Sequence, residues 1–145
     1  MNADQMRTLE RVYQLFRNCP DPGRRQNGEG WSVKEILGHL VDSVSNNHQR
    51  LARYVPRGHL EFPGYDQELC VRRGRYQDFP YDVLLALWYH YNRLLLHIAA
   101  GIPEADLEAT VAVGGNPPVT LRALVADYFA HMENHERQAA RIIGR

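Results

Sequence analysis

The chain has 145 residues with 17 basic and 17 acidic side chains, so its formal net charge is zero. That balance argues against a nucleic-acid-binding protein, which would carry a basic excess to neutralise phosphates. The length and a hydrophobic fraction of 44% are typical of a single globular domain, here residues 1–145. No apolar run approaches the ~20 residues that span a bilayer, so no membrane segment is expected.

The N-terminus and the cysteines predict a cytoplasmic protein. Residues 1–5 lack the basic-then-apolar pattern of a signal peptide. Cys19 and Cys70 are too few and too far apart for a disulfide framework or a cysteine-based zinc site, which is typical of a reducing compartment. The 7 histidines are a high number for this length, and they are the compositional hint of metal chemistry.

A first amphipathic helix is predicted over residues 4–18, with Asp4 as its N-cap. The two prolines and the glycine within residues 20–23 end this helix. The polar, glycine-rich stretch that follows, up to Gly30, is expected to be an exposed loop.

The second helix has the clearest start signal. Ser32 and Glu35 have the spacing of a capping box, in which each side chain bonds the backbone N–H of the other residue. The helix is expected to run to about Val55, because Pro56 follows. Gly38 has no side chain and would let a neighbouring helix come close. The apolar stripe expected to face the core consists of Val33, Ile36, Leu37, Leu40, Val41, Val44, Leu51 and Val55.

A long connection leads to the third helix. Residues 56–80 are rich in proline and glycine, and a short helical turn is expected within residues 65–71. A connection of this length suits a crossover to the far end of the bundle, so that the second and third helices run parallel. The third helix is expected over residues 81–100, closed by Gly101 and Pro103. Its apolar stripe consists of Leu84, Leu87, Trp88, Tyr91, Leu94, Leu95 and Ile98.

The last part of the chain predicts a loop and a fourth helix. Residues 104–119 form the loop, in which residues 110–113 alternate weakly and favour a short extended piece. The helix begins at Thr120, a good N-cap, and runs to about Ile143. Four amphipathic helices with inward stripes predict an all-α four-helix bundle with a long crossover between helices two and three. The last stripe consists of Leu121, Leu124, Val125, Tyr128, Met132, Ala139 and Ile142.

Two histidines, His131 and His135, lie within the arc of this last stripe. Residues at i and i+4 share one helical face, so both imidazoles are expected to point into the bundle. His39 lies beside the stripe of the second helix. Three imidazoles that converge in a bundle could hold one metal ion and leave a fourth position to water, as in catalytic zinc sites. Nickel and iron accept the same ligands.

Each of these histidines also has a plainer interpretation. A single inward histidine is more often a core residue with a hydrogen-bond partner, and the spacing alone can arise by chance. Three buried imidazoles without a metal would each need a partner, which favours the metal. Asp42 or Asp127 could orient a ligand imidazole through its other ring nitrogen, or could equally be a solvated charge. His90 and His97 could serve the same cavity but are expected to be structural or on the surface, and His48 and His59 are expected to be unrelated to the site.

Two segments resemble the DinB-like family of metal-binding four-helix-bundle proteins. They are residues 31–42, WSVKEILGHLVD, and residues 127–135, DYFAHMENH. The resemblance covers nearly the whole chain. Residues 43–50, SVSNNHQR, and residues 87–92, LWYHYN, look like one branch of that family.

The resemblance implies a single zinc or nickel ion held by His39, His131 and His135 and, as in many members, a homodimer. Some members look like metal-dependent hydrolases, and others resemble transferases that use a low-molecular-weight thiol. The sequence is therefore expected to encode a divalent-metal-binding protein that acts on a small-molecule substrate, without nucleic acid or membrane as a partner. A non-catalytic dimeric bundle that binds a metal or a ligand, and a plain structural bundle without metal, are the alternatives. Neither the substrate nor a general base can be assigned from the sequence.

Overall fold

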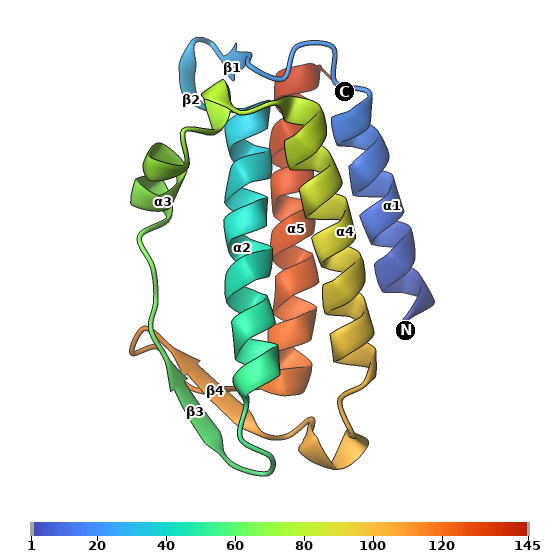
Figure 1. Cartoon of the computed structure of the whole chain (residues 1–145), viewed down its shortest axis with the longest axis vertical. Coiled ribbons are helices and arrows are strands. Elements are labelled where there is room, and N and C mark those ends of the chain that lie inside the picture. The colour runs from blue at the N-terminus through green and yellow to red at the C-terminus, as the bar shows by residue number, and fades with distance from the viewer. Residues whose placement is uncertain (1, 145) are drawn as a thin grey trace.

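Four long helices form a bundle in the computed structural model, which describes residues 2–144 (Figure 1). They are α1 (Ala3–Arg17), α2 (Val33–Arg53), α4 (Tyr81–Ala100) and α5 (Leu121–Ile143). The helices α2 and α4 run in the same direction, and α1 and α5 run opposite to them (Figure 1). The predicted four-helix bundle, with a long crossover that makes α2 and α4 parallel neighbours, is confirmed.

The helix starts follow local capping chemistry. The capping box of α2 is present: Glu35 N donates to Ser32 Oγ, and Ser32 N donates to Glu35 Oε1, both at 3.1 Å. Thr120 caps α5 as predicted and accepts from Ala123 N at 3.1 Å. The prediction for α1 was wrong by two residues. Its N-cap is Asn2, whose extended backbone lets its side chain accept from the N–H of Asp4, which already lies inside the helix.

The end of α2 and the inward face of α4 differ from the sequence-based expectation. Helix α2 ends at Arg53, and Val55 lies beyond it and is exposed, because Tyr54 already has an extended backbone two residues before Pro56. In α4, the predicted stripe included Leu87 and Leu94, but both are nearly half exposed. The buried face of α4 is instead formed by Leu84, Leu85, Trp88, Asn92, Leu95 and Leu96.

Short strands occur in both long connections. The predicted extended piece is strand β4 (Thr110–Val113), which lies between β3 (His59–Phe62), paired parallel, and β5 (Val119–Thr120), paired antiparallel. The sequence did not predict this sheet. The expected helical turn is present as α3 (Gln67–Gly74), which is followed by the 3-10 turn η1 (Tyr76–Asp78). A second 3-10 turn, η2 (Glu104–Asp106), follows α4.

The loop predicted before α2 contains a small hairpin. Strands β1 (Arg25–Gln26) and β2 (Glu29–Ser32) pair antiparallel. Asn27 and Gly28 connect them with φ values of 53° and 76°. Two positive φ values in a two-residue connection are typical of a type I′ turn, for which Asn-Gly is the preferred sequence. The hairpin leads directly into the N-cap of α2.

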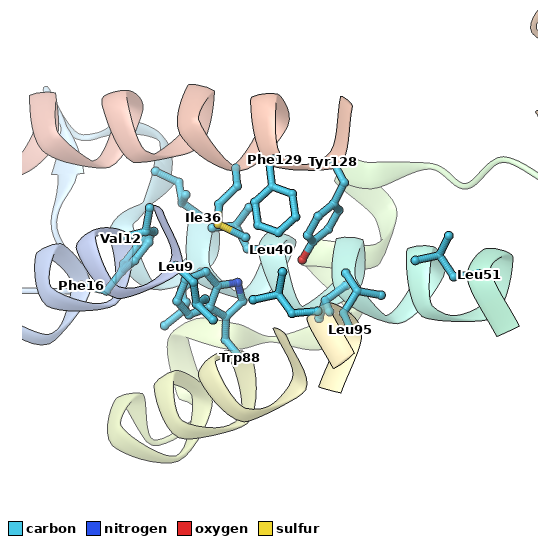
Figure 2. Packing of buried hydrophobic residues seen from close by; sticks show 14 of the residues in the cluster. Leu9, Val12, Phe16, Ile36, Leu40, Leu51, Trp88, Leu95, Tyr128 and Phe129 are labelled. Atoms are coloured by element: carbon cyan, nitrogen blue, oxygen red, sulfur yellow. The ribbon is translucent and has the colours of Figure 1, made fainter. Parts of the chain in front are cut away.

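The core lies between the four helices. Figure 2 shows Trp88 of α4 near Leu9 of α1, with Ile36 and Leu40 of α2 and Phe129 of α5 in the same core cluster. Residues such as Leu9, Ile36 and Trp88 are fully buried. Within residues 2–144, no helix is both long enough and apolar enough to cross a membrane.

Candidate metal centre

Three imidazoles from two helices meet at one point. His39 of α2 is fully buried, and His131 and His135 of α5 are partly buried. The His131 Nε2 atom lies 3.2 Å from Nε2 of His39 and 3.1 Å from Nε2 of His135. One ring nitrogen from each residue lies within 4.8 Å of those of the other two, so the cluster could hold a metal ion. The structure thus brings together the predicted residues, while the binding of a metal by them remains a prediction.

The cluster is electrically neutral at neutral pH. Burial, together with the neighbouring His135 and His131, lowers the pKa of His39 to about 3. Burial, together with His135, lowers the pKa of His131 to about 4. Burial also lowers the pKa of His135. Neutral imidazole is the form that binds a metal.

The ring nitrogens of the three histidines are arranged to bind a cation better than to hydrogen-bond with one another. The Nδ1–H group of His135 donates to Gln138 Oε1 at 2.8 Å, which leaves the Nε2 lone pair of His135 directed at the cluster. The Nε2 atom of His131 has a nitrogen on each side, but it can donate to only one of them. With Zn–N bonds of about 2.0–2.1 Å, a tetrahedral ion would hold its ligand nitrogens about 3.3 Å apart. Two of the three separations, 3.1 and 3.2 Å, are close to this value, and all three nitrogens lie within 4.8 Å of one another.

Aromatic side chains lie against His39 and the neighbouring Gly38. The Trp31 ring lies 4.9 Å from the His39 ring and 6.3 Å from the His135 ring, measured between centroids. On another side of α2, the Tyr76 ring covers Gly38, where an added Cβ would come within 2.1 Å of it. The close neighbour predicted for Gly38 is therefore the Tyr76 side chain of η1, not another helix.

The predicted carboxylate supports for the imidazoles are not observed. Asp42 accepts a hydrogen bond from Tyr76 Oη at 2.5 Å, and within residues 2–144 the buried Nδ1 atom of His39 has no partner. Asp127 is exposed. The residue that orients an imidazole is Gln138, which the sequence reasoning missed. Its position three residues after His135, on the same helical face, was the available signal.

The other histidines lie away from the cluster, as predicted. His90 and His97 are exposed on α4. His48 Nδ1 lies 2.8 Å from Tyr91 Oη, and His59 contacts Thr110 and Glu61 at the surface.

A cavity of about 360 Å³ opens beside His131. Its α2 side is formed by Ser43, Asn47 and Arg50, which are all buried. Tyr65 and Asn116 contribute to the opposite side, from the segments that follow β3 and β4. The sequence reasoning did not assign any of these residues to a pocket, because the opposite side comes from the loops whose sheet it did not predict.

Comparisons with known proteins identify the fold and the family of the chain. The structure matches YfiT from Bacillus subtilis, described as a probable metal-dependent hydrolase with an unusual four-helix bundle topology, with a TM-score of 0.70 and 16% sequence identity. The match covers 97% of this chain and 86% of that one. A search among curated proteins finds no match. The model of the DinB superfamily matches residues 6–139, and the chain therefore belongs to the DinB superfamily.

Proposed function

We propose that this protein is a metal-dependent enzyme that acts on a small molecule, with one divalent ion, zinc or nickel, held by His39, His131 and His135. The observation that carries the proposal is the convergence of three Nε2 atoms next to a cavity that one of the same imidazoles lines. A closed structural site would use four protein ligands, whereas a catalytic site keeps a position for water or substrate.

A divalent ion in this place would lower the pKa of a bound water or thiol towards neutrality and polarise a substrate atom. The side chains of the protein have separate tasks. Gln138 fixes the tautomer of His135 by accepting from its Nδ1–H group. The Trp31 ring covers His39 and shields that side of the cluster from water. His131 faces the cavity, so the substrate would approach from its side.

Hydrolysis is the reaction we favour. The structural relative YfiT is described as a probable metal-dependent hydrolase, which supports this choice as an analogy of fold. A transferase that uses a low-molecular-weight thiol is the second candidate, since a metal can activate a thiol as well as water. The alternative outside enzymology is a bundle that binds a metal or a ligand without turnover.

An assay with and without thiol separates these possibilities. The full chain is freed of metal with a chelator, reconstituted with zinc or nickel, and incubated with a panel of small esters and amides. A hydrolase gives product with metal alone, and a thiol-dependent transferase gives product only when a small thiol is added. Gln138→Ala should reduce turnover, with Gln14→Ala, on α1, as the matched control. Absence of turnover in every metal-loaded sample would contradict the enzyme proposal and favour the non-catalytic alternative.

We further propose that the protein forms a homodimer through α4. Val83, Leu87 and Leu94 are large apolar side chains that are nearly half exposed. Their spacing of four and seven residues aligns them on one face of the helix. A second copy that presents the same face would remove them from water, as in an isologous interface.

The cytoplasm is the location we propose, because a chain with only two cysteines is typical of a reducing compartment. Fractionation of cells that produce the protein would test this, and recovery outside the cytoplasm would contradict it.

A further inference from the structure

The face of α2 that carries His39 is polar along much of the helix. His39, Ser43, Asn47 and Arg50 are four of the buried polar residues in the protein, and steps of four, four and three residues separate them. That spacing places them on one helical face. Buried polar groups carry a desolvation cost unless they are paired. Asn47 Nδ2 donates to Ser43 O at 2.9 Å, whereas within residues 2–144 Nδ1 of His39 and Nε of Arg50 have no partner. The row leads from the histidine cluster to a cationic side chain.

Arg50 is a buried charge without a counter-ion. Only 8% of the residue is exposed. Within residues 2–144, no carboxylate forms an ion pair with Arg50, and its buried Nε–H group has no acceptor. Its remaining polar contact is a long one, from Nη1 to Asn47 Oδ1 at 3.4 Å. Burial lowers the pKa of the Arg50 guanidinium, because the charged form is poorly solvated there.

The surroundings fix the guanidinium beside the cavity. Its Cζ atom lies 5.4 Å from the centre of the Phe62 ring, a cation–π distance. The contact with Asn47, one turn earlier, shows that the side chain leans back along α2 towards the end that carries His39. Because Arg50 and His131 line the same cavity, one small molecule can reach both.

The opposite side of the cavity is formed by two loops in close contact. An added Cβ at Gly114 would lie 3.2 Å from the Cα atom of Gly64, so these two backbones pass close to each other and leave little room for a side chain at residue 114. Tyr65 follows at once and lines the same cavity as Arg50, and burial raises the pKa of its phenol. Asn116 adds an exposed amide at the rim. These groups are neutral at pH 7, so they do not neutralise the arginine.

We propose that Arg50 binds an oxyanion of the substrate, a carboxylate or a phosphate, and so holds a small anionic molecule with its reacting bond at the three-histidine cluster. This inference rests on the proposed function and names the substrate class of that site. A guanidinium recognises both anions through charge-assisted hydrogen bonds, and its planar fork favours them over other groups. Asn47 and Ser43, in the same row, are placed to bind the polar atoms between the anion and the reacting bond.

The test is a titration of the full chain with inorganic phosphate and, separately, with acetate, followed by NMR of the backbone amides of Gly64 and Gly114. It is run on the chain with its metal and again after chelation. We expect saturable changes in the chemical shifts of these amides with and without metal. The anion that saturates them at the lower concentration is the preferred oxyanion. Because the chelated chain has no ion that could bind the anion, failure of this inference is distinguishable from failure of metal binding.

Two variants and one control locate the binding. Arg50→Gln should weaken the binding of the preferred anion by about tenfold or more. Arg53→Gln is the matched control, because Arg53 also lies over Phe62 but is exposed and does not line the cavity. Asn116→Asp places a negative charge at the rim, leaves the buried residues unchanged, and should weaken binding even if Arg50→Gln does not fold. The proposal would be overturned if wild type and folded Arg50→Gln bound the anion equally well. It would also be overturned if Asn116→Asp had no effect, or if neither anion gave a saturable change in chemical shift.

Discussion

The parallel neighbours α2 and α4 depart from the usual division between apolar interior and polar surface in opposite ways. Helix α2 buries polar side chains, among them His39 and Arg50, whereas α4 exposes apolar ones, among them Leu87 and Leu94. Either departure is costly unless something binds there. The comparison supports our proposals that the two helices serve different partners: a metal and a small anion inside the protein, and a second protein surface outside it.

The largest expected effect contrasts the two faces of α4. Leu84 is 2% exposed and Leu87 is 48% exposed, although they lie three residues apart. Leu84→Ala should lower the free energy of unfolding by about 2–5 kcal/mol, because it leaves a cavity in the core. Leu87→Ala should change the free energy of unfolding of the monomer by less than about 0.5 kcal/mol. Urea unfolding at low protein concentration measures both values, and similar losses in the two variants would refute the assignment of the faces.

A smaller effect is expected at the close contact of α2 with η1. In Gly38→Ala the new methyl group would lie 2.1 Å from the Tyr76 ring, so the ring must move and its hydrogen bond to Asp42 is disturbed. Overpacking of this kind costs about 1–3 kcal/mol. Tyr76→Phe is the comparison, since it removes the hydroxyl and keeps the ring. If Gly38→Ala were as stable as wild type in thermal unfolding, the packing described for Tyr76 would be wrong.

The buried histidines of α2 and α5 predict a pH dependence of the metal-free protein. The pKa values of His39 and His131 are lowered from 6.5 to about 3 and about 4. Between 6.5 and these values the unfolded chain binds more protons than the folded one, so the free energy of unfolding must fall as the pH falls through that window. His39→Gln should show a shallower fall than wild type, while His48→Gln, which lies outside the cluster, should follow wild type. If the free energy of unfolding of His39→Gln fell with pH as steeply as that of wild type, the lowered pKa of His39 would be contradicted.

The smallest change in folding stability is expected from a charge on the outer face of α4. Leu87→Glu should dissociate the proposed dimer, because two carboxylates would be brought together in an apolar interface, and should leave the fold of the monomer intact. Sedimentation velocity, with Arg93→Glu as a matched exposed control on the same helix, measures the assembly. If the wild-type protein were monomeric at high concentration, the proposal that α4 forms a dimer interface would be wrong.

Much of the fold could be predicted because its signals are local. The capping box at Ser32 and Glu35, the N-cap at Thr120 and the prolines around the crossover depend on neighbours in sequence. The β1–β2 hairpin was also readable, since Asn27-Gly28 is a strong turn signal, but it was missed. The pairing of β3 with β4 joins residues about fifty positions apart and has no local signature.

The site divides in the same way. His131 and His135 could be predicted because residues four apart share one helical face. His39 could be predicted because it lies beside the apolar stripe of α2. The orientation of Leu87 could not be fixed from the sequence, because α4 is apolar on nearly all sides and a stripe marks a direction only when the opposite face is polar. Arg50 was not assigned to the site either, because its burial depends on Phe62 and on the loops that follow β3 and β4.

Metal analysis of the purified chain tests the central claim most directly. Wild type should contain about one zinc or nickel ion per chain, and His131→Ala should contain none, because three protein ligands are the usual minimum for such a site. His90→Ala, an exposed histidine on α4, should keep the full content. Titration of the metal-free chain with the ion should also change the tryptophan fluorescence, because the Trp31 ring lies 4.9 Å from the His39 ring. Full metal content in a folded His131→Ala variant, or a wild type that binds neither ion, would contradict the metal centre.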